Sequence, residues 1–149
     1  MYEIYTDGGC DNIRTKAGSW CYVVVKEKMY IRESSGLELN TTNNRVEYLA
    51  VINAMNYLIK NNITEAVINT DSQLLVNTYN SWMLKWYKNG TWKKTGGAIK
   101  NIDLVKELYS VKTNNPGFKL CWVKGHSGIE WNEYCDEVCS TILNEYLKV

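Results

Sequence analysis

The spacing of apolar residues changes partway along this chain, and the change restricts the fold more than any other feature. Three β-rich runs come first, at residues 2–6, 18–25 and 29–34, and a short charged turn joins the last two as in a hairpin. From Asn43 to Lys60 the apolar residues instead recur at helical spacing. We therefore expect three meander strands followed by a helix.

The rest of the chain alternates between short strands and helices. Meander strands followed by βαβ units predict an α/β fold, with a mixed sheet and helices on both of its faces. A chain of 149 residues with no linker and no internal repeat predicts one domain, residues 1–149. We expect strands at 66–69 and 118–123, helices at 72–79, 101–111 and 131–147, and a basic lobe rich in tryptophan and glycine at 82–97.

Positive and negative side chains are distributed unevenly. The formal net charge is only +1, so the total charge does not indicate a polyanionic partner. The average conceals a basic lobe and an acidic cluster elsewhere. No Asp or Glu occurs between Ser72 and Ile102, and the lysines in that stretch are Lys85, Lys88, Lys93, Lys94 and Lys100.

The five cysteines form no C-x-x-C pair, which favours free thiols in a reducing compartment. Cys135 and Cys139 are spaced as two small buried side chains on one helix face. The sequence opens without a signal segment and contains no apolar run of the ~20 residues that span a bilayer. We expect a cytoplasmic protein, with a nuclear location as the alternative, and no membrane contact.

Two aspartates are expected at the ends of strands. Asp7 follows the first strand-like run, and Asp71 follows the fourth. Open α/β sheets bind their ligands beyond the carboxyl ends of the strands, so both aspartates are candidates for a functional site. For Asp71, which precedes a predicted helix, N-capping is an equal alternative.

Glu47 lies on a helix face that is otherwise apolar, together with Val51, Ala54 and Leu58. A carboxylate turned toward a core is costly unless it is paired or bound to a cation. The helix dipole offsets about 0.3–1 kcal/mol of that cost, so a structural role is the alternative.

Asp136 repeats this pattern near the end of the chain. It borders the face formed by Cys139, Leu143 and Leu147, and Asn132 precedes it by one helical turn, where an amide can hold its carboxylate. Four acids on elements that pack together would repel one another. A hard divalent cation with oxygen ligands resolves this repulsion, and magnesium fits. The cysteine spacing and the single histidine do not favour zinc.

Five motifs occur in order along the chain: Tyr5–Gly8, Thr42–Glu47, Thr70–Ser72, the lobe from Trp82 to Trp92 with its lysines, and Trp122–Gly128 followed by Asn132 and Cys135–Glu137. Together they resemble type 1 ribonuclease H over essentially the whole chain, without a separate hybrid-binding domain. The resemblance implies a ribonuclease H-like fold: a five-stranded mixed sheet with three antiparallel and then two parallel strands, helices on both faces, and a basic protrusion.

The resemblance also implies the chemistry. Two magnesium ions, with manganese as a substitute, would clamp the reacting oxygens, and the RNA strand of an RNA–DNA hybrid would be cut to leave 5′-phosphate and 3′-hydroxyl ends. His126 matches the mobile-loop histidine of the family, and an ordinary pKa of about 6.5 suits it to proton transfer or product release. A solvated histidine without a role is the alternative. The implied metal ligands and catalytic acids are Asp7, Glu47, Asp71 and Asp136.

Recognition of the RNA strand is expected to depend on its 2′-hydroxyls, which short amides can contact. The resemblance assigns this role to Asn43 and Asn44, and also to Asn12. Helix N-capping is the alternative for Asn43.

Recognition of the DNA strand is expected in the basic lobe, since lysines bind phosphates and aromatic rings stack on sugars and bases. A solvated loop with Trp86 and Trp92 packed into a small core of its own is the alternative. Asn40 stands where some relatives carry arginine, which weakens the phosphate pocket. The resemblance places the lobe contacts at Trp82, Lys85, Trp86, Lys88, Lys93 and Lys94, and the phosphate pocket at Thr42, Lys100 and Asn101.

Three other functions are weighed against this one. Another nuclease of the same fold, such as a junction resolvase or an integrase-like enzyme, would lack the lobe and the Thr-Asn-Asn-Arg-x-Glu motif. A non-catalytic hybrid-binding module would be indicated by the loss of one acid, and all four are present. Numbering from Met1 disfavours a portion of a larger polymerase. We expect a monomer whose partner is the RNA–DNA hybrid duplex.

Overall fold

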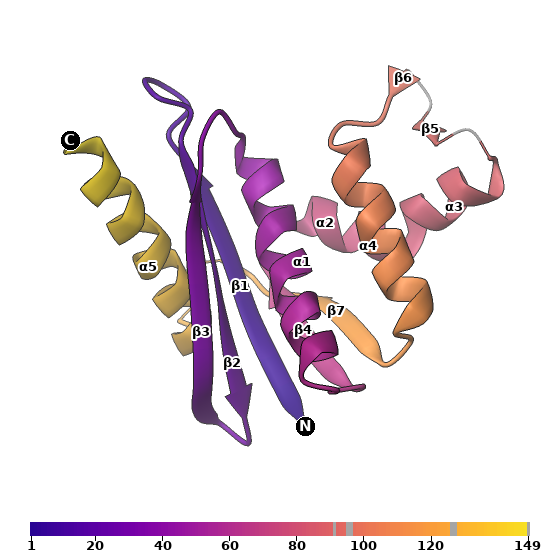
Figure 1. The fold of residues 1–149 in the computed structure, drawn as a ribbon, viewed down its shortest axis with the longest axis horizontal. Helices are drawn as coiled ribbons and strands as arrows, with labels where there is room; N and C mark the ends of the chain where they lie inside the picture. Colours follow the sequence, from indigo (N-terminus) through magenta and orange to yellow (C-terminus); the bar gives the residue numbers. More distant parts are fainter. Residues whose placement is uncertain (91, 95–96, 126–127, 149) are drawn as a thin grey trace.

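A central sheet organises the computed structural model, which describes residues 1–90, 92–94, 97–125 and 128–148 (Figure 1). The main elements are β1 (Tyr2–Cys10), β2 (Gly18–Lys26), β3 (Met29–Glu38), α1 (Asn43–Lys60), β4 (Ala66–Thr70), α2 (Gln73–Asn77), the π-helical turn η1 (Thr78–Trp82), α3 (Met83–Lys88), β5 (Lys93–Lys94), β6 (Gly97–Ala98), α4 (Ile102–Asn114), β7 (Phe118–Trp122) and α5 (Glu130–Leu147).

The strand order in the main sheet is β3-β2-β1-β4-β7. The pairs β3–β2 and β2–β1 are antiparallel, and the pairs β1–β4 and β4–β7 are parallel, which confirms the predicted mixed sheet. Two strands are longer than the sequence indicates. β1 continues to Cys10, which pairs with Gly18 of β2. β3 continues to Glu38, which pairs with the same Gly18 from the opposite side of β2.

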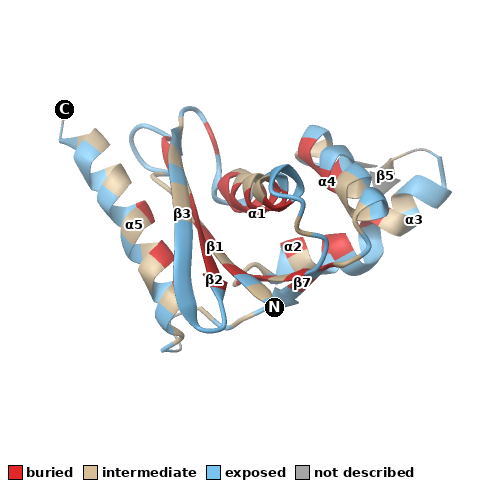
Figure 2. Ribbon diagram, turned by 60° about the horizontal axis from the view of Figure 1, so that its bottom comes forward, coloured by how far each residue is buried: buried red, intermediate tan, exposed pale blue. Residues whose placement is uncertain are grey.

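Helices cover both faces of the sheet, as predicted: α5 packs against β1 and β2 on one face, and α1 packs against them on the other (Figure 1). The strand β2 lies between these two layers, and its middle is buried on both sides (Figure 2). Tyr22 and Val24 face the larger core under α1, whereas Cys21, Val23 and Val25 face α5. Burial on both faces explains why this strand is a continuous apolar run with no polar alternation.

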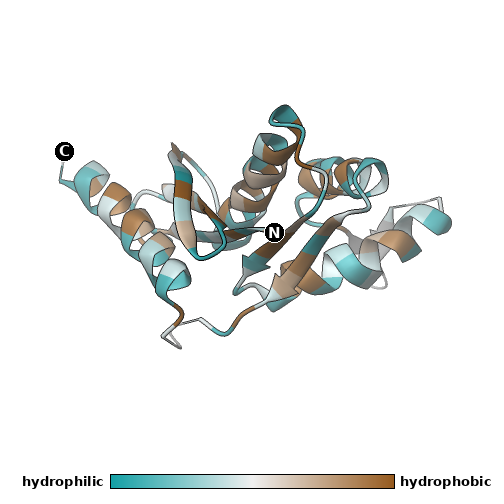
Figure 3. Cartoon of the chain, turned by 90° about the horizontal axis from the view of Figure 1, so that it is seen from below, coloured by the Kyte–Doolittle hydropathy of each residue, from teal (hydrophilic) through white to brown (hydrophobic). Residues whose placement is uncertain are grey.

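Apolar residues gather on the strands, and the helices carry alternating hydrophilic and hydrophobic bands (Figure 3). All five cysteines are free thiols, and Cys135 and Cys139 are buried against the sheet. Among the described residues, the helices are too short or too polar to cross a bilayer.

The basic lobe begins with a short helix and continues into a small hairpin, a secondary structure that the sequence left open. The helix expected at 72–79 ends at Asn77, and the chain continues through η1 and α3 before the small β5–β6 hairpin. The lobe packs on α4, where the rings of Tyr87 and Tyr109 stack with 4.5 Å between their centroids. It thus projects from the end of the molecule opposite α5 (Figure 1).

Candidate active site

The parallel register of β1 and β4 brings two aspartates together. Tyr2 to Tyr5 pair with Ala66 to Asn69, and the same register carried onward places Asp7 opposite Asp71. Asp7 lies within β1 and not at its end, because that strand continues along β2, where Asp7 pairs with Cys21. The strand that ends at the site is β4, and the space beyond its last residue lies beside Asp7.

Glu47 reaches the same point from α1. Its helix face is buried as predicted, with Val51, Ala54 and Leu58 fully buried and Glu47 8% exposed. The helix lies so close to β1 at Gly8 that a Cβ on this residue would be 2.8 Å from Val46 Cγ2 and 3.0 Å from the Glu47 nitrogen. Only glycine allows this approach, so Gly8 sets how near Glu47 lies to Asp7.

Three carboxylates form one cluster as a result. Oxygens of Asp7, Glu47 and Asp71 all lie within 4.8 Å of one another. Asp7 is only 5% exposed, whereas Asp71 is partly exposed at the rim. The cluster is thus open on the Asp71 side and closed on the side of the sheet.

Backbone and hydroxyl donors hold the buried carboxylates in place. The N–H of Gly8 donates to Oε1 of Glu47 at 2.7 Å and to Oδ1 of Asp7 at 2.9 Å. The hydroxyl of Thr70 donates to Oε2 of Glu47 at 3.4 Å and accepts from the N–H of Ser72 at 3.2 Å. Both oxygens of Glu47 are therefore anchored before any ligand arrives.

Burial and neighbouring charge raise the pKa of both Asp7 and Glu47. Burial, and then the charge of Asp71, raise the pKa of Asp7 to about 7, although hydrogen bonds with Glu47 and with the N–H of Gly8 lower it. Burial, and then the charges of Asp7 and Asp71, raise the pKa of Glu47 well above its ordinary value. Like charges crowded in a poorly hydrated site favour protonation, and a bound cation removes that preference.

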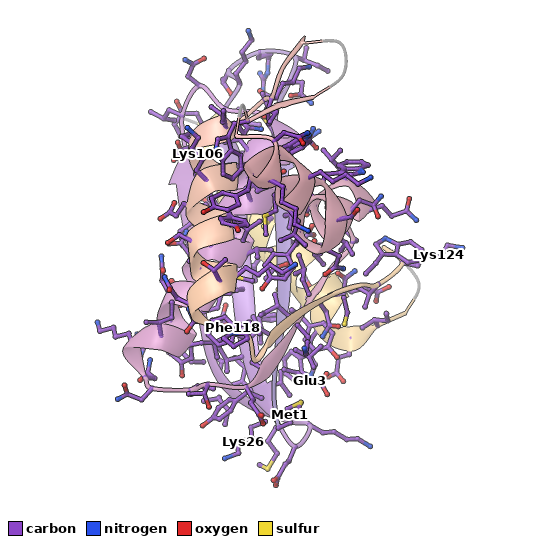
Figure 4. The ribbon with its side chains drawn as sticks, turned by 90° about the vertical axis from the view of Figure 1, so that its right-hand side faces the viewer. Met1, Glu3, Lys26, Lys106, Phe118 and Lys124 are labelled. Carbon is purple, nitrogen blue, oxygen red and sulfur yellow. The ribbon has the colours of Figure 1, made fainter. Side chains whose placement is uncertain are left out.

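Asp71 is not the cap of the helix that follows it. The hydroxyl of Ser72 takes this role by accepting from the N–H of Leu75 at 3.2 Å. The loop after β7 passes close to Asp71, since a Cβ on Gly125 would lie 2.9 Å from its Oδ2. Lys124 lies on the same loop (Figure 4). The N-capping alternative was therefore wrong, and the Asp71 carboxylate faces the cluster.

Asp136 lies on α5, which covers the opposite face of the sheet from α1 and its Glu47. It is outside the close group of three acids, but its charge is near enough to raise the pKa of Asp7. Asn132, one turn earlier, is 2% exposed, and its Oδ1 makes no hydrogen bond within the part of the chain that the structure describes. Three acids thus meet closely, and the fourth lies at their margin.

The donor set suits a hard divalent cation. The ligand atoms are carboxylate oxygens, the type that magnesium, manganese and calcium prefer, and the described residues bring neither a thiol nor an imidazole into the group. The crowded carboxylates also need positive charge at neutral pH, because burial already disfavours their ionisation. The residues present therefore fit such an ion.

A separate pocket of about 270 Å³ lies between α1, the lobe and the start of α4. Trp82 forms part of its wall and is 36% exposed, and its ring centroid lies 6.4 Å from that of Trp86. The lining combines aromatic and apolar walls with amides and one ammonium group: Asn44, Tyr48, Leu74, Thr78, Trp82, Trp86, Ile99, Lys100 and Asn101.

The remaining predicted contact residues that the structure describes do not line this pocket. Asn12 is exposed in the loop after β1, and Asn43 is exposed in the first turn of α1. Thr42, and not Asn43, caps α1, because its Oγ1 accepts from the N–H of Arg45 at 3.2 Å. The other predicted residues divide by what the structure describes: Lys85 and Lys88 are exposed on α3, Lys93 and Lys94 form β5 with side chains outside the description, and His126 lies outside the described residues.

The three lobe tryptophans are not equivalent. Trp92 packs edge-on against Tyr87 and Tyr109, with Lys106 above its ring, and it also packs against the main core, so it does not belong to a separate core of the lobe. Trp86 packs against the main core and also lines the pocket, whereas Trp82 is the more exposed of these two.

Three supporting residues were missed by the sequence analysis. Gly8 and Thr70 hold Glu47, and Arg45 donates from Nη1 to Oδ1 of Asn101 at 3.3 Å. All three belong to the motifs that carried the resemblance, so the signal was present. Their roles depend on contacts between distant segments, which the motifs do not specify.

Comparison with known proteins agrees with this geometry. The family model described as RNase H matches residues 1–143. Ribonuclease H of Campylobacter jejuni subsp. jejuni serotype O:23/36 (strain 81-176) is 41% identical over 134 residues, which cover 90% of this chain and 85% of that protein. The crystal structure of LC9-RNase H1, a type 1 RNase H with the type 2 active-site motif, is 29% identical with a TM-score of 0.79, and the match covers 94% of this chain and 70% of that one.

A further solved structure, LC11-RNase H1 in complex with RNA/DNA hybrid, shares the fold with a TM-score of 0.70 and 21% identity, over 96% of this chain and 99% of that one. The family model spans nearly the whole chain, and the acids of the cluster lie on the elements that the five motifs implied. The chain therefore belongs to the ribonuclease H family and is an enzyme with ribonuclease H activity.

Proposed function

We propose that this enzyme is an endonuclease that hydrolyses the RNA strand of RNA–DNA hybrids and leaves 5′-phosphate and 3′-hydroxyl ends. The observation that carries the proposal is the group of Asp7, Glu47 and Asp71 oxygens within 4.8 Å of one another, beside a pocket lined by amides, tryptophans and a lysine. A carboxylate cluster of this kind suits metal-assisted phosphodiester hydrolysis, and the pocket suits a sugar–phosphate backbone.

The four acids Asp7, Glu47, Asp71 and Asp136 would hold two magnesium ions, with manganese as a substitute. When bound, these ions supply a nucleophilic water and stabilise the leaving 3′ oxygen. The chain itself fixes the ligands: Gly8 and Thr70 hold Glu47, and the parallel register holds Asp7 beside Asp71. His126 is proposed to transfer a proton or to assist product release.

Discrimination of RNA from DNA is proposed to come from short amides that reach the 2′-hydroxyls: Asn43 and Asn44 on the first turn of α1, together with Asn12. Trp82 would face the DNA strand, with exposed lysines of the lobe on its phosphates. The five free thiols support a reducing, cytoplasmic location, and we propose a monomer.

One cleavage assay tests this function. The full chain is incubated with 5′-labelled RNA–DNA, RNA–RNA and DNA–DNA duplexes, each with magnesium or with chelator, and the products are sized and tested for a 3′-hydroxyl by polymerase extension. We expect cutting of the hybrid alone, within its RNA strand, and only with the metal. Binding of the hybrid without cutting would instead support a non-catalytic module, and cutting of DNA–DNA would support another nuclease.

A further inference from the structure

Arg45 lies where a positive charge is electrostatically unfavourable. It belongs to the first turn of α1, and that turn contains no acidic residue. The dipole of an α-helix places partial positive charge at this end, so a guanidinium here is destabilising unless an acid lies close to it. A specific partner is therefore needed to explain the arginine.

The partner is Asp103, in the first turn of α4. Nη2 and Nη1 of Arg45 donate to its two carboxylate oxygens at 2.8 and 3.2 Å. The hydrogen bonds raise the pKa of Arg45 and lower the pKa of Asp103. The side chains are 29% and 61% exposed, and pairs this exposed add little stability. The main consequence of the two-point contact is geometric, because it fixes the plane of the guanidinium.

The same guanidinium determines how an amide is turned. Nη1 of Arg45 also donates to Oδ1 of Asn101 at 3.3 Å. Arginine has donors only, so the oxygen of the Asn101 amide must face Arg45 and its NH₂ group must face away. The Asn101 backbone is held too, because it adopts a left-handed φ of 57° and its carbonyl accepts from Leu104 and Val105. The Asn101 side chain does not cap its own helix, so its NH₂ group can donate to a ligand.

The place for such a ligand is the pocket between α1 and the lobe. Asn101 lines this pocket beside Lys100, and Asn44 lines it from the first turn of α1. The amino ends of α1 and α4 therefore meet at the pocket, where their dipoles, the ammonium and the amide donors all favour an anion.

We infer that Arg45 is a positioning residue, which orients the Asn101 amide so that its NH₂ group donates to a backbone phosphate of the bound nucleic acid. This inference rests on the proposed function and deepens it. Arg45 does not touch the substrate: Asp103 holds the guanidinium, the guanidinium holds Oδ1, and Nδ2 is presented to the phosphate. Lysine could not replace it, because an ammonium lacks the planar fork that holds carboxylate and amide at once.

A double-mutant cycle tests the inference. Dissociation constants for a hybrid duplex are measured without divalent metal for the wild type, Arg45→Lys, Asn101→Ala and the double variant, and KM and kcat are measured with magnesium. We expect each single change to weaken binding and raise KM by about tenfold, as for one lost hydrogen bond to a charged group, with kcat within about twofold. The double variant should bind no more weakly than Asn101→Ala. Equal effects of Arg45→Lys in both backgrounds would overturn the inference.

A second variant distinguishes a loss of hybrid binding from a loss of folding stability. Asn101→Asp keeps an oxygen toward Arg45 and gains an ion pair, so its melting temperature should equal or exceed that of the wild type. It has no NH₂ group and repels phosphate, so it should bind the hybrid more weakly than Asn101→Ala. Wild-type affinity in Asn101→Asp would refute the inference. Arg32→Lys, the same change at an exposed site on β3, is the matched control and should alter neither quantity.

The two proposals fail in different ways. If the wild-type protein binds and cuts the hybrid but the effects of Arg45→Lys and Asn101→Ala on binding are additive, only the positioning role is refuted. A wild-type protein with no affinity for the hybrid refutes the proposed function, and the positioning role falls with it.

Discussion

The carboxylate cluster and the basic lobe, residues 82–97, are built in opposite ways. The cluster is formed by long, buried elements, with Asp7 and Glu47 only 5% and 8% exposed and anchored by the backbone of Gly8. The lobe is formed by a short helix and a small hairpin, and Lys85 and Lys88 are exposed on its surface. Both regions carry concentrated charge of a single sign, but only the cluster removes that charge from water.

The difference separates two tasks. Buried carboxylates have a fixed geometry and raised pKa values, at a cost to the stability of the metal-free fold. Exposed lysines lose little hydration and fix no precise geometry, which is sufficient for holding a polyanion of any sequence. We therefore expect the cluster to control the rate of cleavage and the lobe to control affinity, and the experiments below separate these quantities.

The largest effect is expected for Asp7→Asn. The amide keeps an oxygen for the N–H of Gly8 but loses the charge, so cleavage should fall on the order of a thousandfold, near the upper end of losses from removing one preorganised group. Hybrid affinity should change by less than about threefold, since phosphate contacts dominate it. Single-turnover cleavage and binding are measured side by side. Glu3→Gln, near Met1 at the far end of the same strand (Figure 4), is the control, and cleavage at the wild-type rate by Asp7→Asn would refute this role.

A large effect on stability is expected from pH and metal together. The pKa of Asp7 is raised from 3.8 to about 7, so the folded protein binds more protons than the unfolded chain between these values. The stability of the metal-free protein should therefore fall as pH rises through this range. Magnesium at about 100 times its dissociation constant should raise the melting temperature by about 5–10 °C at pH 8 and by much less at pH 5.

Thermal denaturation at both pH values, with magnesium or chelator, measures this effect. The same scans on Asp7→Asn provide the control, because removal of one titrating acid should reduce the dependence on pH. A metal-free protein that is more stable at pH 8 than at pH 5, with no change in Asp7→Asn, would contradict the electrostatic account of the cluster.

An intermediate effect is expected in the lobe for Trp82→Ala. The ring lines the pocket and is 36% exposed, so its loss should weaken hybrid binding by about tenfold, as for one lost stacking contact, with the melting temperature lowered by less than about 3 °C. Trp86→Ala is the matched comparison, because Trp86 also packs against the main core and should lower the melting temperature more. A large loss of stability with unchanged affinity in Trp82→Ala would make that residue part of the core.

The smallest effect is expected for Lys88→Gln on the lobe. One lost phosphate contact should weaken binding uniformly among hybrids of different sequence and reduce the salt dependence by about one ion, with kcat unchanged. Lys60→Gln, also in the last turn of a helix, is the control. Binding titrations over a range of salt concentrations measure how steeply affinity falls with salt. A fall in kcat would contradict the assignment of affinity to the lobe and of cleavage rate to the cluster.

Local patterns predicted most of the fold and failed where distant segments meet. The change of apolar spacing identified the five main strands and α1, α4 and α5, because each pattern reports which face of its own segment is buried. The end of β1 was misplaced since Cys10 stays in the sheet only through its pairing with Gly18. The capping alternatives named for Asn43 and Asp71 were wrong, since Thr42 and Ser72 cap these helices. A cap depends on backbone geometry as well as residue type.

The sequence by itself determined which side chains carry charge, which faces are buried and to which family the chain belongs. Only the tertiary structure decided how these groups meet: the register that sets Asp7 opposite Asp71, the contact at Gly8 that brings Glu47 close, and the arginine fork that turns Asn101. The physical reason is that such contacts join residues far apart in the chain. Their geometry depends on how whole elements pack, and no local pattern of residues specifies it.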